Sequence, residues 1–83
     1  MNYKIKSELI DFIDKFKSFL PKDDIESIRE LVDAGEYKVA FENLCTQLYE
    51  YEIKVEPATV KELDNIGTKM KLNKSLWLDL LST

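Results

Sequence analysis

Few side chains in this sequence could carry covalent chemistry, and the chain has no histidine. Histidine is the side chain that most often serves as the base for a serine or cysteine nucleophile. The single cysteine, Cys45, falls among apolar residues at helical spacing, which predicts a buried, inert thiol. Adjacent acids such as Asp23 and Asp24, or Glu50 and Glu52, do not share a helical face and are poor candidates for carboxylate catalysis. We therefore expect that the protein is not an enzyme.

The sequence also offers little to a metal or a cofactor. One cysteine without histidine excludes an internal disulfide and the usual thiolate and imidazole metal cluster. Gly35 and Gly67 are isolated, so there is no glycine-rich phosphate loop. An acyl carrier needs a serine that follows an acid at the head of a helix, whereas Ser75 follows Lys74. We expect no cofactor and no metal; an enzyme subunit or carrier remains an alternative that mass spectrometry would detect through a covalent arm.

Charge is concentrated in the middle of the chain. Residues 21–56 hold four basic and ten acidic side chains, a net charge of −6, whereas the whole chain carries −4. Such a field repels nucleic acid and attracts a basic protein surface. An acidic face that only aids solubility explains the charge equally well.

Tyr49 lies among acids in this segment and is the best candidate for a partner contact. A rigid aromatic side chain beside carboxylates is typical of a surface that meets a basic partner, although Tyr49 could equally pack on another helix. We predict that the partner contacts are Glu42, Tyr49, Glu50 and Glu52. The competing acidic surface consists of Asp23, Asp24, Glu26 and Glu30.

The segment 36–52 is predicted to be the central helix, because its apolar residues recur at helical spacing. At about 100° per residue they occupy one continuous sector, the predicted core face. This sector consists of Tyr37, Ala40, Phe41, Leu44, Cys45, Leu48 and Tyr51.

The flanking segments predict further helices. A first helix spans 3–19, with Phe19 in its apolar stripe, and ends before Pro21. A second begins near Asp23, with a capping box formed by Asp23 and Glu26, and ends at Gly35 in a left-handed conformation. An extended connection over 52–56 leads to a fourth helix that starts at Pro57.

The C-terminal part completes the bundle. Gly67 lies on the apolar side of the fourth helix and is predicted to let a neighbouring backbone approach closely, with fraying of the helix as the alternative. Asn73 is predicted to cap a last short helix. That helix covers the open end of the bundle with Leu76, Trp77, Leu80 and Leu81. The predicted fold is all-α: one domain over residues 1–83, with four main helices and a short C-terminal helix.

The cellular setting follows from the same composition. No apolar run approaches the roughly 18 residues of a membrane span, and charge interrupts the apolar residues at the N-terminus. A single cysteine suits a reducing compartment. We expect a cytoplasmic protein with no membrane partner.

The central string GEYKVAFENLCTQLYEYEIKV at 35–55, the segment IGTKMKLN at 66–73 and the terminal WLDLL at 77–81 resemble a known family. They are similar to the small helical immunity proteins of the MafI and contact-dependent inhibition (CdiI) type, which share a Gly-Glu-Tyr or Gly-Glu-Trp start, a Glu-Asn-Leu-Cys-like step and a Gln-Leu-Tyr-Glu-Tyr end. The matching residues are Gly35, Glu36, Tyr37, Ala40, Glu42, Asn43, Leu44, Cys45, Gln47, Leu48, Tyr49, Glu50, Tyr51, Ile66, Gly67, Met70 and Leu72. The resemblance covers roughly residues 8 to 80.

This resemblance implies a cytoplasmic protein that binds and blocks the toxic C-terminal domain of a polymorphic toxin delivered between neighbouring bacteria. In several relatives that domain resembles a nuclease, including the EndoU-like ribonuclease type. The expected partner is one basic toxin domain, bound one-to-one, with no direct nucleic-acid contact and no small-molecule substrate. An antitoxin or acidic adaptor that binds another basic cytoplasmic protein is the alternative function.

Overall fold

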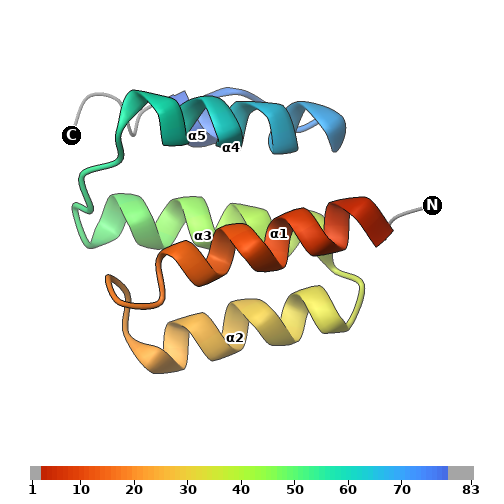
Figure 1. Cartoon of the computed structure of the whole chain (residues 1–83), viewed down its shortest axis with the longest axis horizontal. Helices are drawn as coiled ribbons and strands as arrows, with labels where there is room; N and C mark the ends of the chain where they lie inside the picture. Colours follow the sequence, from red (N-terminus) through yellow and green to blue (C-terminus); the bar gives the residue numbers. More distant parts are fainter. Residues whose placement is uncertain (1–2, 79–83) are drawn as a thin grey trace.

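The protein is all-α, as the sequence predicts. The structure, a computed structural model, describes residues 3–78, which form five helices and no strand. The helices are α1 (Tyr3–Lys15), α2 (Lys22–Asp33), α3 (Tyr37–Glu50), α4 (Pro57–Lys69) and the short α5 (Ser75–Leu78) (Figure 1). Among these described residues, no helix combines the length and the apolar character that crossing a membrane requires.

The helix α3 lies at the centre of the arrangement. It packs against α1, α2 and α5, and α4 packs against α1 and α5. Figure 1 shows α2 and α3 as an antiparallel hairpin, with α1 lying along them and α4 on the opposite side of α3 from α2. The prediction that 36–52 contains the central helix is therefore confirmed, with the helix ending two residues earlier than expected.

The predicted core face of α3 is buried over most of its length. Ala40, Phe41, Leu44 and Leu48 have no exposed surface, and Cys45 is 2% exposed. The prediction was wrong for Tyr51, which is 49% exposed. Tyr51 is the C-cap residue, so it stands at the end of the helix, beyond the buried part of the core face.

The end of α1 also differs from the prediction. The helix ends at Lys15 rather than Phe19, and the next residues form tight turns in which Phe16 N donates to Ile13 O at 3.0 Å and Phe19 N to Phe16 O at 2.9 Å. Pro21 disfavours helical geometry directly only in the preceding residue, Leu20, so it does not account for an end at Lys15. Because the helix ends there, Phe19 leaves the apolar stripe and is 61% exposed.

The helix α2 begins at Lys22, with Pro21 as its N-cap residue and no side-chain capping hydrogen bond. The predicted capping box of Asp23 and Glu26 is therefore wrong. Proline can precede a helix because its fixed φ suits the approach to the first turn, and here Pro21 O accepts a hydrogen bond from Ile25 N at 3.1 Å. Both acids stand in or just after the first turn, where the helix dipole favours negative charge.

Three helices end in the same left-handed motif. After α2, Gly35 has a φ of 83°, as predicted, and Glu36 N donates to Leu31 O at 2.8 Å. Glu52 after α3 (φ 53°) and Lys71 after α4 (φ 60°) occupy the corresponding position without being glycine. This hydrogen-bond pattern is a Schellman motif, which satisfies the last carbonyl groups of a helix.

The short helix α5 covers the bundle through Trp77, which has no exposed surface. Its ring contacts Phe41 edge-to-face at 5.5 Å between centroids, and its Nε1 donates to Asp64 Oδ1 at 3.0 Å. The same ring occupies the space beside Gly67 where a Cβ would stand. Gly67 thus lets a side chain approach α4 closely, whereas the sequence predicted the close approach of a neighbouring backbone.

The other predictions for this end of the chain have mixed outcomes. Pro57 is the first residue of α4, and Asn73 Oδ1 accepts a hydrogen bond from Ser75 N at 2.9 Å at the head of α5, so both predictions are confirmed. Residues 53–56 of the predicted extended connection are non-helical, whereas Glu52 at its start adopts the left-handed conformation. Leu80 and Leu81, which were predicted to cover the bundle, lie outside the described residues.

Candidate functional site

The outward face of α3 carries two exposed apolar side chains. Val39 is 41% exposed and Tyr49 is 53% exposed, and the intervening Asn43 and Thr46 are also exposed. Tyr49 therefore lies at the surface rather than in the core. An exposed aromatic side chain on a regular helix can serve as an anchor for a partner protein.

The structure brings together only part of the predicted set of contacts. Glu42 and Tyr49 are seven residues apart and so lie on the same side of α3, about two turns apart. Glu50 is about 100° further around the helix, and Glu52 lies beyond the C-cap in the left-handed conformation. Glu42 is half-buried beside Cys45, whereas Glu50 and Glu52 are exposed. The four residues thus span a broad surface rather than a compact cluster.

Ion pairing divides the acidic residues into two groups. The described residues form three salt bridges: Lys15 with Glu62 at 2.7 Å, Arg29 with Asp14 at 3.1 Å and Lys69 with Glu8 at 3.0 Å. The acids in these pairs all belong to α1 and α4. None of the ten acids in residues 21–56 forms a salt bridge within the described part of the chain. Arg29 is the one cation of this segment that forms a salt bridge with a described residue, and its partner Asp14 lies on α1.

The hairpin of α2 and α3 therefore carries an uncompensated negative field. We call it the acidic hairpin; it consists of Asp23, Asp24, Glu26, Glu30, Asp33, Glu36, Glu42, Glu50, Glu52 and Glu56, of which the last follows the hairpin directly. Lysines 22, 38 and 54 lower its net charge without pairing with its acids among the described residues. Both the predicted contact residues and the competing surface belong to it.

Tyr51 connects the two helices of the acidic hairpin at one end. Its hydroxyl donates a hydrogen bond to Asp24 Oδ2 at 3.0 Å. This bond to the Asp24 carboxylate is the main reason why the pKa of Tyr51 is raised. Ionising the phenol would remove the donor and place a second negative charge beside Asp24. This hydrogen bond keeps the exposed ring of Tyr51 close to the Asp24 carboxylate.

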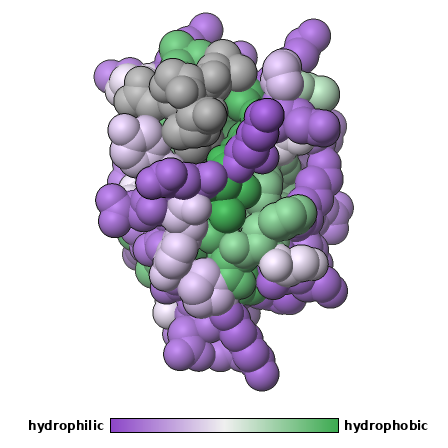
Figure 2. All heavy atoms as spheres, turned by 90° about the vertical axis from the view of Figure 1, so that its left-hand side faces the viewer, coloured by the Kyte–Doolittle hydropathy of each residue, from purple (hydrophilic) through white to green (hydrophobic). Residues whose placement is uncertain are grey.

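An apolar hollow at the end of the bundle was missed by the sequence analysis. It has a volume of about 480 Å³ and is lined by Lys15, Phe16, Phe19, Lys54, Val55, Glu56 and Thr59. Figure 2 views this end of the molecule and shows apolar surface surrounded by hydrophilic side chains. Phe16 and Phe19 meet edge-to-face, with centroids 6.3 Å apart. No signal in the sequence placed Phe19 outside the core, because its spacing continues the apolar stripe of the first helix.

Cys45 offers no reactive group at this surface. Burial, with a smaller contribution from the charge of Glu42, raises the pKa of its thiol to about 12. The nucleophilic thiolate is therefore almost absent near neutral pH. Among the residues described by the structure, no group of three or more cysteine, aspartate or glutamate side chains is placed to hold a metal ion.

Comparisons with known proteins returned no family model, no curated protein and no solved structure that matches this chain.

Proposed function

We propose that this chain is an immunity protein that binds and neutralises the toxic C-terminal domain of a contact-dependent growth inhibition toxin. The observation that carries the proposal is the acidic hairpin, whose ten carboxylates form no salt bridge among the described residues. A field of this sign is complementary to a basic protein surface. The resemblance of residues 35–55 to MafI-type immunity proteins supports the same function.

The proposed toxin domain is a nuclease, with an EndoU-like ribonuclease as one candidate. A nuclease must hold phosphates, so its cleft carries positive charge, and the acidic hairpin would occupy that cleft or cover it. Binding is one-to-one and involves no covalent chemistry, and it takes place in the cytoplasm, where the toxin would reach its RNA. Exposed Tyr49 provides an aromatic anchor among the carboxylates.

The test of the function is growth rescue. The toxic C-terminal domain encoded beside this gene would be expressed under an inducible promoter with and without the protein. Restored growth, together with a one-to-one complex on size-exclusion chromatography, is the expected result. If the neighbouring gene encodes no secreted toxin, or if a toxic domain still kills, the alternative of an antitoxin or adaptor for another basic cytoplasmic protein takes its place.

The test of the site uses two charge-reversal pairs in the complex. Glu42→Lys with Glu50→Lys changes the outward side of α3, and Asp23→Lys with Glu30→Lys changes α2 without touching the Tyr51 to Asp24 hydrogen bond. Charge reversal at contact residues should accelerate dissociation of the complex. Charge reversal outside the contact should change mainly the association rate. We expect the α3 pair to speed dissociation at least about tenfold, which corresponds to about 1.4 kcal/mol.

The matched control is Ser7→Lys with Asp11→Lys and Asn65→Lys, which changes the net charge by the same amount at three exposed positions outside the acidic hairpin. It should slow association slightly and leave dissociation unchanged. All three variants must first show an unchanged thermal unfolding midpoint. Dissociation of the α3 variant at the wild-type rate would move the contact to α2 or to the apolar hollow.

Salt provides an independent measurement of the proposed electrostatic steering. Raising the ionic strength from about 0.01 M to 0.15 M shortens the Debye length from about 30 Å to 8 Å. The association rate should then fall by about tenfold or more, and the dissociation rate should change far less. An association rate that does not depend on salt would mean that the acidic hairpin serves solubility alone.

A further inference from the structure

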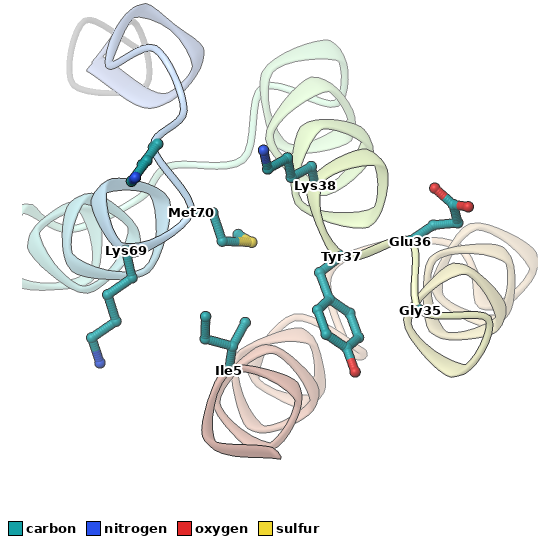
Figure 3. A pocket seen from close by; sticks show the side chains of 8 residues that line it. Ile5, Gly35, Glu36, Tyr37, Lys38, Lys69 and Met70 are labelled. Atoms are coloured by element: carbon teal, nitrogen blue, oxygen red, sulfur yellow. The ribbon is translucent and has the colours of Figure 1, made fainter. Parts of the chain in front are cut away.

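A second cleft lies between α3 and α4, away from the apolar hollow. Its volume is about 440 Å³, and it opens where α4 packs on α1 and α5 rather than on α3. Ile5, Tyr37 and Met70 supply its apolar lining from three different parts of the chain. Figure 3 shows Ile5 and Met70 directed into the gap between the helices. The volume falls within the range of small-ligand pockets, about 300 to 1,000 Å³.

Lysines surround this cleft although the protein is acidic. Lys38, Lys69 and Lys71 line it, together with one acid, Glu36. Lys69 is neutralised by Glu8, to which its Nζ donates hydrogen bonds of 3.0 and 3.2 Å. Lys38 and Lys71 form no salt bridge within the described residues. Figure 3 shows the Glu36 carboxylate turned away from the gap, so the cleft has a positive charge of its own.

Two features of the backbone increase this positive character. The cleft includes the first residues of α3, Tyr37 and Lys38, and Glu36 before them makes no side-chain capping hydrogen bond. The first N–H groups of a helix carry partial positive charge and favour an anion. Lys71 keeps a φ of 60°, a conformation that glycine adopts at lower cost, and it places a lysine rather than a bare backbone at the cleft.

We propose that this cleft binds a small amphiphilic anion, a carboxylate or phosphate head group attached to an apolar body. The head group lies between Lys38, Lys71 and the first turn of α3. The apolar body covers Ile5 and Met70. A fully apolar ligand would gain nothing from the two exposed lysines, and an inorganic anion would leave the apolar lining in water, so the cleft favours a molecule with both parts.

The test is a titration of the full chain by two-dimensional amide and methyl NMR. Octanoate and octyl phosphate are the probes with both parts; octanol lacks the charge, and acetate and inorganic phosphate lack the apolar body. Octanoate or octyl phosphate should shift the signals of Ile5, Lys38 and Met70 in a saturable manner. Whichever of the two binds more tightly identifies the head group, and the three partial probes should bind at least about tenfold more weakly.

The variant Lys38→Gln with Lys71→Gln should weaken binding of the tighter probe about tenfold. Lys17→Gln with Lys22→Gln is the matched control, because it removes two exposed lysines elsewhere and should leave the affinity unchanged. Equal binding of octanol, equal binding of acetate or inorganic phosphate, or shifts centred on Phe16 and Phe19 would each overturn the proposal. Absence of saturable binding by both amphiphilic probes would overturn it as well. None of these measurements involves a toxin, so the outcome is separate from that of the proposed function.

Discussion

Cys45 shows how burial limits the chemistry of a single side chain. Its thiol is 2% exposed, and folding raises its pKa from 9.0 to about 12. Above pH 9 the unfolded chain loses this proton while the folded protein keeps it. The contribution to stability is therefore complete below pH 9 and declines as the pH rises towards 12.

This decline in stability with rising pH leads to a prediction for Cys45→Ala. Near neutral pH, the variant should be less stable than the wild type by about 1 kcal/mol, because it leaves a small cavity. Between the unfolded pKa of 9.0 and the folded pKa of about 12, each pH unit should lower the stability of the wild type by up to about 1.4 kcal/mol relative to the variant, so the variant should become the more stable protein. Urea unfolding of both proteins at neutral and alkaline pH measures the difference. A stability difference that stays constant with pH would show that the folded thiol ionises normally.

The ring of Trp77 determines which side chains position 67 can accommodate. A Cβ at position 67 would occupy the space of the Trp77 ring, so Gly67→Ala should destabilise the protein by about 1 to 3 kcal/mol. In a Trp77→Ala background the same change should instead stabilise α4 by roughly 1 kcal/mol through helix propensity. A double-mutant cycle by thermal unfolding measures this reversal. The same cost in both backgrounds would place the clash elsewhere.

At the scale of the element, the helix ends explain much of the local geometry. Gly35, Glu52 and Lys71 hold the same left-handed position, but only Gly35 adopts it without a steric penalty from a Cβ. The hydrogen bonds of Ile53 N to Leu48 O at 2.9 Å and Leu72 N to Gly67 O at 3.0 Å keep the other two in place. Apolar residues at positions 53 and 72 follow each motif and pack on the core.

Substitutions at these positions should therefore have opposite signs. Lys71→Gly and Glu52→Gly should each stabilise the protein by about 0.5 to 1 kcal/mol, and Gly35→Ala should destabilise it by about 1 kcal/mol. Thermal unfolding of the three variants checks the set. Lys74→Ser, at an exposed position outside the motif, is the control. A loss of stability in both glycine variants would show that the side chains matter more than the backbone conformation.

At the scale of the whole molecule, the core depends on the apolar face of α3. Leu44→Asp places an unpaired carboxylate at a fully buried position, which should cost more than about 4 kcal/mol and unfold the chain. Asn43→Asp is the matched control, since it introduces the same charge at the exposed neighbouring position. Circular dichroism melts compare the two variants. Cooperative melting of Leu44→Asp would show that α3 is not central.

The distribution of salt bridges is also a property of the whole molecule. The salt bridges join α1 with α2 and with α4, whereas the acids of the α2 and α3 hairpin have no such partner among the described residues. The bundle thus contains a paired side and an unpaired acidic side. The arrangement stabilises the fold only slightly, since exposed pairs contribute about 0 to 1 kcal/mol each. Its larger effect is the field presented to other molecules.

The sequence by itself determined the all-α class, the central helix and most of its core face, because local periodicity decides which side of a helix is apolar. It also placed Gly35 and Pro57 correctly, since backbone restrictions on these residue types act locally. For the candidate surface, it indicated the negative segment and placed Glu42 and Tyr49 off the core face of the central helix.

Only the tertiary structure decided which of these acids are free of salt bridges, because their partners would come from distant helices. It also decided that Tyr51 bonds Asp24, that Phe19 faces the apolar hollow and that the ring of Trp77 lies against Gly67. The cleft of Ile5, Lys38 and Lys71 has no signal in the sequence, as its residues come from segments more than thirty positions apart. A helical wheel describes one helix at a time, whereas these features depend on how helices pack and where they end.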